Sequence, residues 1–257
     1  MLEKIEYVFP KDTKSIELFN LLSTLFRDIE YVTVFKANEI HAISSNLSPK
    51  TVFKLDSNIS NIQLNIENQK YVNLLNRKLE YNKASSEVIK LPIKDVATKL
   101  TGHIRRIDHT GINLPASLYS KEDWKNLLKY FSSISNIYNY PTGEPWTFLI
   151  PTTVEENQNE ITNFEIIREP RFELVYDDYT NIITIQIDIE TNLSKTEVEN
   201  LFPKNQGIYF KGLEDVYKAI YLDYSDYIDI RLDIRFKGLH GEFESGEWLV
   251  NEGKRII

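Results

Sequence analysis

Two segments in the C-terminal half alternate strictly between apolar and polar positions. From residue 183 to residue 190 every second residue is isoleucine, and the residues between are Thr184, Gln186, Asp188 and Glu190. Residues 228–235 repeat the pattern, with polar positions at Asp229, Arg231, Asp233 and Arg235. Because side chains alternate between the two faces of a strand, each segment predicts a β-strand with one buried face and one polar face. We expect the charged residues of the second segment on the outer face, where they pair across strands.

Other segments have the spacing of amphipathic helices. In the first of them Leu18, Leu22 and Leu25 recur three or four positions apart, which places them on one helical face. Ser194 and Glu197 have the S-x-x-E spacing of a capping box, which marks the start of another helix. The predicted helices span residues 14–29, 69–82, 121–134, 194–202 and 213–221.

Short strands fill most of the remaining chain, and their order suggests a repeat. The sequence β-α-β-β-β is predicted in both halves, with a boundary near residues 90–102. We therefore expect an α+β fold of tandem βαβββ-like modules, with mixed or antiparallel sheets and flanking helices. Residues 1–100 are predicted to form a diverged N-terminal module, and residues 101–257 a C-terminal domain. The further strands are predicted at residues 5–10, 31–45 (two strands), 52–55, 62–66, 103–114, 146–150, 171–177 and 246–250.

Composition narrows the chemistry. The 257 residues contain no cysteine, so disulfides, thiolate metal sites and cysteine nucleophiles are excluded, and a metal would need His, Asp or Glu ligands. The net charge of −8 argues against a dominant nucleic-acid role, which needs a clustered cationic face. No apolar run long enough for a transmembrane helix and no secretory signal are found, so we expect a cytoplasmic protein.

Several common catalytic motifs are also missing from the sequence. The phosphate-binding patterns G-x-x-x-x-G-K and G-x-G-x-x-G do not occur, which disfavours nucleotide hydrolysis and Rossmann-type redox chemistry. The G-x-S-x-G and H-E-x-x-H patterns do not occur either, which disfavours α/β-hydrolase and zincin activity.

Two of the four histidines, His103 and His109, lie six residues apart in one predicted strand. An even spacing directs both imidazoles to the same face of a continuous strand. At about 3.3 Å per residue, however, they would lie roughly 20 Å apart, too far to share a metal ion. His103 is therefore predicted to be a bystander.

The segment around His109 resembles the opening strand of modules in the vicinal oxygen chelate superfamily, which includes glyoxalase I, bleomycin-resistance proteins and extradiol dioxygenases. Members of that family build βαβββ modules, and the histidine of this strand is the first metal ligand. The fourth strand of such a module carries a glutamate as second ligand, and residues 171–177 resemble it with Glu173 at that position. The matching residues of the first segment are Ile107, Asp108, His109, Gly111, Ile112 and Leu114.

The second half of the family pattern is incomplete in this chain. Thr184 occupies the position of the second-module histidine. The fourth ligand, an acid on the last strand, would fall near Val250, with Glu247 and Glu252 on either side.

The resemblance implies a diverged glyoxalase-like protein that binds a small ligand or a divalent metal in a sheet-lined cavity. His109 and Glu173 would be the metal ligands. Because one histidine is missing, two alternatives are equal: the protein binds a divalent metal (Zn, Ni, Mn or Fe), or it binds no cofactor. If the protein is an enzyme, the resemblance implies a metal-dependent lyase, isomerase or dioxygenase.

Plainer interpretations stay open beside this one. In one alternative, His109 is a buried histidine whose hydrogen bonds are satisfied by Asp108 or Glu173. In another, Glu173 lies on a solvated face. The alternative function is a non-catalytic protein-interaction or ligand-binding role. The partners considered are a small molecule and a second copy of the chain. Binding to nucleic acid or to a membrane is not expected.

Overall fold

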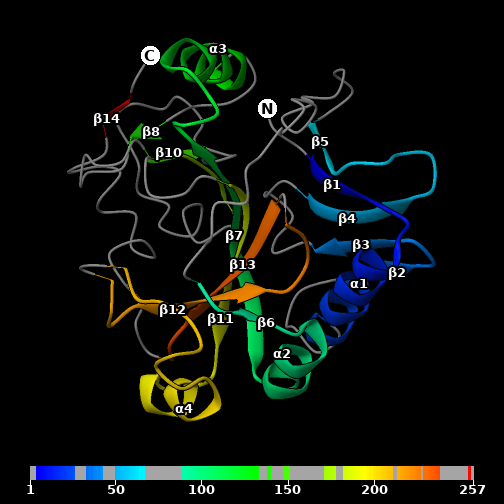
Figure 1. The fold of residues 1–257 in the computed structure, drawn as a ribbon, viewed down its shortest axis with the longest axis vertical. Helices are drawn as coiled ribbons and strands as arrows, with labels where there is room; N and C mark the ends of the chain where they lie inside the picture. Colours follow the sequence, from blue (N-terminus) through cyan, green and yellow to red (C-terminus); the bar gives the residue numbers. More distant parts are fainter. Residues whose placement is uncertain are drawn as a thin grey trace, which may run out of the picture.

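The protein is described by a computed structural model, shown as a ribbon in Figure 1. Within the part of the chain that it describes, the strands form a five-stranded and a nine-stranded sheet. The described residues are 4–26, 33–42, 50–66, 88–132, 138–139, 147–150, 171–177, 182–210, 213–226, 228–237 and 254–255.

The first sheet has the strand order β2-β3-β4-β1-β5. β1 pairs in parallel with β4 and antiparallel with β5. Helix α1 follows β1; it begins after Asp12, whose side chain accepts a 2.7 Å hydrogen bond from the Ser15 amide. The bounds are β1 Lys4–Pro10, α1 Thr13–Leu25, β2 Thr33–Lys36, β3 Glu39–Ala42, β4 Lys50–Asp56 and β5 Gln63–Ile66.

The second sheet has the order β14-β8-β9-β10-β7-β11-β13-β12-β6, with β7 and β11 near its centre. Helices α2, α3 and α4 connect its strands, and α4 starts with the expected capping box of Ser194 and Glu197. The bounds are β6 Lys90–Leu91, α2 Ile93–Leu100, β7 Ile104–Pro115, α3 Lys121–Ser132, β8 Tyr138–Asn139, β9 Thr147–Ile150, β10 Arg171–Asp177, β11 Ile183–Thr191, α4 Lys195–Leu201, β12 Tyr217–Leu222, β13 Ile228–Arg235 and β14 Lys254–Arg255.

The strand pairing repeats along the chain. In the unit β1-α1-β2-β3-β4 the first strand pairs in parallel with the last, and β7-α3-β8-β9-β10 has the same order. In each unit the next strand, β5 or β11, adds antiparallel to the free side of the first strand. β11, α4, β12 and β13 form a shorter version, with β11 parallel to β13. The expected α+β fold with βαβββ-like modules is confirmed.

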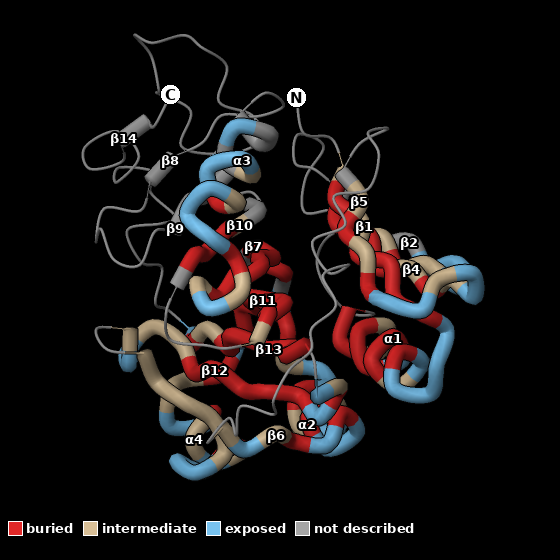
Figure 2. The backbone as a smooth tube through the Cα atoms, turned by 45° about the horizontal axis from the view of Figure 1, so that its top comes forward, coloured by how far each residue is buried: buried red, intermediate tan, exposed pale blue. Residues whose placement is uncertain are grey.

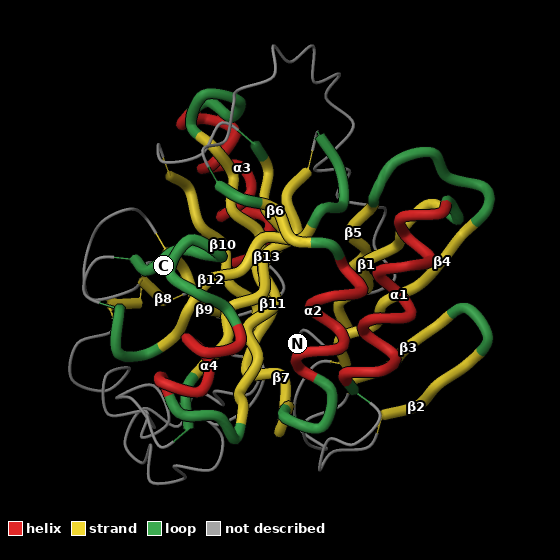
Figure 3. The backbone as a smooth tube through the Cα atoms, turned by 60° about the horizontal axis from the view of Figure 1, so that its bottom comes forward, coloured by secondary structure: helices red, strands yellow, loops and turns green. Residues whose placement is uncertain are grey.

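One hydrophobic core joins the two sheets. The buried cluster includes side chains of β1 and α1 together with those of the apolar faces of β7, β11 and β13. Figure 2 shows the buried backbone in both groups of elements. Helices α1 and α2 lie side by side (Figures 1 and 3). Phe9 packs edge-to-face on Tyr224 with ring centroids 6.1 Å apart, and the Ser15 hydroxyl lies 2.8 Å from the Tyr224 hydroxyl. The division of the chain at residue 100 stays a prediction.

The structure corrects two expectations about secondary structure. The helix predicted at residues 213–221 is wrong, because Tyr217–Leu222 forms β12 and pairs antiparallel with β13. An adjacent strand supplies hydrogen bonds that override the local helical spacing. Helix α2 (Ile93–Leu100) lies where only a boundary was expected.

Some expectations fall on residues outside the described ranges. These are the helix at 69–82, the strand at 246–250 and the acids Glu247 and Glu252. Among the described helices, none is long and apolar enough to cross a membrane.

The central strand offers a test of the core. Ile187 on β11 is fully buried, whereas Ile16 on α1 is 38% exposed. We expect Ile187→Ala to lower the free energy of unfolding by about 2–5 kcal/mol, because it removes buried methyl groups and leaves a cavity. Ile16→Ala is the control and is expected to change it by less than about 0.5 kcal/mol. Urea unfolding of both variants measures the difference, and equal midpoints would contradict this core.

Candidate functional site

The polar face of the second sheet is buried. The alternation of β11 and β13 is the one expected from sequence, but the expectation that the charged residues of β13 lie on an outer face is wrong. Arg231 is 4% exposed and Asp233 0%, and the ring of Phe210 lies over the Arg231 guanidinium at 4.9 Å. The buried polar residues of this face are His109, Asn113, Thr184, Gln186, Asp188, Glu190, Asp229, Arg231 and Asp233.

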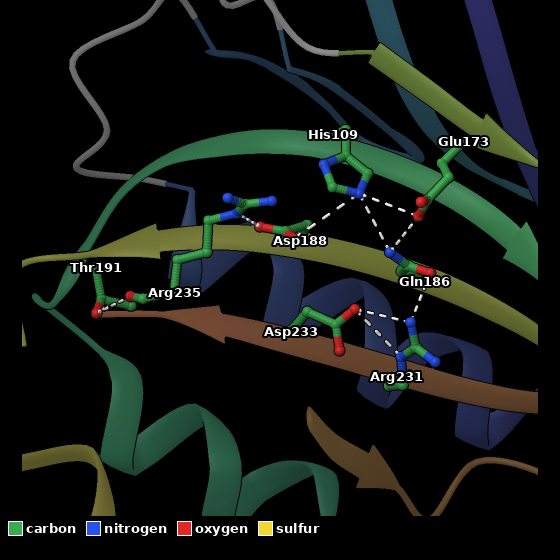
Figure 4. Close-up of polar contacts among 8 residues, drawn as sticks. All are labelled: His109, Glu173, Gln186, Asp188, Thr191, Arg231, Asp233 and Arg235. Atoms are coloured by element: carbon green, nitrogen blue, oxygen red, sulfur yellow. Dashed lines mark hydrogen bonds and ion pairs between the residues drawn. The ribbon is translucent and has the colours of Figure 1, made fainter. Parts of the chain in front are cut away.

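Strand register sets which of these residues meet. Gly111 on β7 pairs with Glu173 on β10 and with Gln186 on β11, and Gln186 pairs in turn with Arg231 on β13. These four residues form one row across four strands. His109 lies in the neighbouring row, two positions before Gly111. Figure 4 shows how the side chains of both rows converge.

His109, Glu173 and Gln186 form a compact triangle. The Gln186 Nε2 donates to Glu173 Oε2 at 2.6 Å and lies 3.2 Å from His109 Nε2. The His109 Nε2 and Glu173 Oε2 are 3.3 Å apart. The structure therefore brings together the two residues that the family resemblance singled out, although both are engaged by a third residue that the resemblance did not include.

Arg231 fixes the orientation of that third residue. Its Nη2 donates to Gln186 Oε1 at 2.6 Å and to Asp233 Oδ2 at 2.8 Å. A guanidinium has donors and no acceptor, so the amide oxygen of Gln186 faces Arg231. The NH₂ group of Gln186 consequently faces His109 and Glu173.

The remaining charges of the face are also paired. Arg235 Nε donates to Asp188 Oδ1 at 2.6 Å, and Asp188 Oδ2 lies 3.8 Å from His109 Nε2. At the rim of the face, Lys90 lies 2.6 Å from Asp229, and Arg105 2.8 Å from Glu190. Pairing of this kind is what buried charges require, because an uncompensated buried charge costs several kcal/mol.

The surroundings shift two carboxyl pKa values in opposite directions. Burial raises the pKa of Glu173, but the hydrogen bond with His109 and the charges of His109 and Arg231 outweigh it and hold the pKa below its usual value. Burial raises the pKa of Asp233, and the adjacent Arg231 offsets only part of that rise. Glu173 is thus held as a carboxylate at neutral pH.

Among the described residues, three buried oxygen atoms on this face accept no hydrogen bond: Asn113 Oδ1, Asp229 Oδ1 and Asp233 Oδ1. Asp229 Oδ1 lies 2.6 Å from Lys90 Nζ in an ion pair, which leaves Asn113 Oδ1 and Asp233 Oδ1, in residues that are 4% and 0% exposed, without a partner. Asn113 lies on β7 two positions beyond Gly111, and Thr184 is its partner on β11. Both unpartnered atoms accept hydrogen bonds.

Gly111 makes room for the triangle. A Cβ atom at this position would lie 3.0 Å from both the Cβ and the carbonyl oxygen of Glu173. Glu173 and Gln186 lie on strands on either side of β7, and their side chains meet above Gly111. A side chain at residue 111 would occupy the space that this hydrogen bond crosses.

The other candidate residues lie apart from this cluster. His103 precedes β7 in a turn, and its Nδ1 is 3.1 Å from Asn192 Oδ1. The expectation that it shares one continuous strand with His109 is wrong. His41 lies in the first sheet, 2.9 Å from Glu39.

Sequence reasoning missed the residues that join β11 to β13. The signal was present, because Gln186, Asp188, Arg231, Asp233 and Arg235 all stand at polar positions of alternating strands. Only the pairing of the two strands shows that these positions face one another. The region expected to carry the fourth ligand, near Val250, lies outside the described residues. Within the described residues, the strand that pairs in parallel with β11 is β13.

The donor set does not fit a divalent ion as it stands. Among the described residues no group of three or more His, Asp or Glu side chains is placed to hold a metal. His109 and Glu173 would supply two donors, but the Gln186 NH₂ group, which has no lone pair to offer, lies against both. Metal binding by His109 and Glu173 stays a prediction from sequence.

Comparison with known proteins gives a weak likeness only. No protein-family model matches this chain. No curated protein matches it either. Among solved structures, the chain is similar to homoprotocatechuate 2,3-dioxygenase from Arthrobacter globiformis at 10% identity and a TM-score of 0.36, over 96% of this chain and 87% of that one.

The same enzyme from Brevibacterium fuscum gives similar values. Its complex with 3,4-dihydroxyphenylacetate matches at 9% identity and a TM-score of 0.37, over 91% of this chain and 80% of that one. A variant of the B. fuscum enzyme matches at 10% identity and a TM-score of 0.38, over 91% and 71%. Extradiol dioxygenases belong to the superfamily that the His109 segment resembles, but similarity at this level assigns neither membership nor activity.

The space above Gly111 gives a second prediction. Gly111→Ala is expected to lower the free energy of unfolding by about 1–3 kcal/mol, because the added methyl group overlaps the backbone and Cβ of Glu173. Urea unfolding measures this loss. An unchanged midpoint would mean that β7 and β10 do not approach as closely as described.

The buried cation gives a third prediction, with a matched control on the same face. Arg231→Met leaves Asp233 and the Gln186 oxygen without their donor, and is expected to cost about 3–5 kcal/mol. Arg105→Met removes an ion pair whose arginine side chain is 42% exposed, and is expected to cost about 1 kcal/mol or less. Both values come from urea unfolding at neutral pH, and similar costs for the two variants would contradict the burial of Arg231.

Proposed function

We propose that this chain is a diverged protein of the vicinal oxygen chelate type that binds a small polar molecule on the polar face of its second sheet, without a metal. Residues 101–257 carry the site in this proposal, and residues 1–100 contribute to the shared hydrophobic core. The resemblance around His109 and the repeated βαβββ pairing support the family type. The unpartnered oxygens of Asn113 and Asp233 support the binding.

The two unpartnered acceptors are the observation on which the proposal depends. A buried acceptor without a partner costs about 1–3 kcal/mol. Asn113 and Asp233 lie in different rows of this face, on either side of the row from Gly111 to Arg231, so each marks a separate point at which a bound molecule supplies a missing donor. Because both free atoms are acceptors, the ligand is expected to carry hydroxyl or amino groups.

Burial favours this role over the alternative of a protein-interaction surface. Protein partners recognise exposed patches, whereas most of the polar residues at the centre of this face, among them Asn113, Gln186 and Asp233, are less than 9% exposed. Small-molecule sites are enclosed and use a few convergent polar groups. We propose no catalytic step, since the described residues do not offer the open metal position that a lyase, isomerase or dioxygenase of this family type would need.

A ligand screen on chelator-treated protein tests the proposal. Small polyols, amines, hydroxy acids and catechols are tested at millimolar concentration for a rise in Tm, and each hit is measured by isothermal titration calorimetry. The test variant is Asn113→Leu, which removes one free acceptor. The control is Asn65→Leu, because Asn65 in the first sheet also has an unpartnered Oδ1.

We expect at least one hit to bind the wild type and Asn65→Leu equally. Asn113→Leu should weaken it at least tenfold, which is about 1.4 kcal/mol. Asn113→Leu should also be no less stable than the wild type, since it removes an unsatisfied buried atom. Binding that is unaffected by Asn113→Leu, or no binding by any member of the screen, would overturn the proposal.

A further inference from the structure

The centre of the second sheet has an approximate two-fold relation in its strand pairing. β7 pairs in parallel with β10 on one side, and β11 pairs in parallel with β13 on the other. β7 and β11 are neighbours and run antiparallel, with Gly111 opposite Gln186. A two-fold axis perpendicular to the sheet at this point would exchange β7 with β11 and β10 with β13.

That relation assigns a counterpart to each candidate ligand. His109 lies two residues before Gly111, and Thr184 lies two residues before Gln186, so the two correspond. Glu173 pairs with Gly111, and Arg231 pairs with Gln186, so these two also correspond. One half of the face therefore offers an imidazole and a carboxylate, and the other half offers a hydroxyl and a guanidinium.

Arg231 places a positive charge at the position where a symmetric site would have a second carboxylate, the counterpart of Glu173. Arg231 is buried and held by Asp233 on its own strand. Its positive charge is linked to Glu173 through a single amide, because Gln186 accepts from Arg231 and donates to Glu173. Arg231 also lowers the pKa of Glu173 through its charge.

We propose that Arg231 takes the electrostatic place of a divalent ion on this face and, together with Gln186, excludes such an ion. The guanidinium balances the buried carboxylates and repels a second cation. It also turns the NH₂ group of Gln186 toward His109 and Glu173, so that a donor lies where a metal would need an acceptor lone pair. The proposal extends the metal-free binding proposed above, but its test uses no ligand.

Cobalt titration of four proteins tests this role. Co²⁺ is added to chelator-treated full-length protein, and binding is followed by calorimetry and by the visible absorption of the bound ion. The proteins are the wild type, Thr184→His, Arg231→Gln and the double variant Thr184→His/Arg231→Gln. Thr184→His adds the missing imidazole, and Arg231→Gln removes the cation while its amide can still donate to Asp233.

We expect the wild type and each single variant to bind Co²⁺ weakly or not at all. The double variant is expected to bind at least about tenfold more tightly than Thr184→His alone, and adding His109→Ala should abolish that binding. If Thr184→His alone binds as tightly as the double variant, Arg231 does not exclude metal and the proposal is wrong. The proposal is also wrong if the wild type binds one equivalent of Co²⁺ that His109→Ala removes.

Far-UV circular dichroism separates loss of fold from loss of binding. If the variants with Arg231→Gln are unfolded without metal, the comparison is between the wild type and Thr184→His, which keeps the arginine. Tight binding by Thr184→His then overturns the proposal, and its absence supports it. The ligand screen decides the proposed function independently, because it uses neither metal nor the Thr184 and Arg231 variants.

Discussion

The interaction on which the rest of the structure depends is the row of side chains from Glu173 through Gln186 to Arg231. β11 is buried on both faces and so is β13 up to Ile234, so water does not satisfy the charges at the centre of the polar face. The row connects a carboxylate on β10 with a guanidinium on β13 through two hydrogen bonds across the intervening strands. It is possible only because Gly111 on β7 leaves the space between them empty. The same row of hydrogen bonds therefore both stabilises the sheet and sets the geometry of the site.

Register determines whether this arrangement exists at all. A slip of one residue on β11 would turn its isoleucines toward the charges and Gln186 toward the core, so the buried polar face fixes the pairing strongly. β7 contains a β-bulge that makes this register possible. Asp188 pairs with His109, but the next residue of β11, Ile189, pairs with Ile107, so the pairing passes over Asp108. This bulge lets Ile107 stay in the core while His109 keeps its place beside Glu173.

The sequence predicts the parts of this arrangement that a single segment encodes. Alternation located β11 and β13 to within a residue or two, capping residues located the start of α4, and the His109 segment with Glu173 identified two residues that do meet. The partners that Gln186 and Arg231 find depend on which strand lies beside which, and no local pattern contains that information. The same reason explains the error at Tyr217–Leu222, where pairing with β13 overrides a helical spacing. Burial of the charged face was missed because alternation alone does not tell a solvated face from a covered one.

A guanidinium in the place of a metal changes what the site is able to do. An arginine balances negative charge and orients an amide, as Arg231 does with Gln186. It has no exchangeable coordination position, so it does not take a substrate oxygen as a ligand or lower the pKa of a bound water. Under the proposed role of Arg231, the face therefore recognises polar groups by hydrogen bonds and does not activate them, which is the physical reason for preferring binding to catalysis here. Conversion toward a chelate site would require the change of charge at Arg231 and a donor at Thr184 together, because an imidazole added beside a buried cation would gain no ion to bind.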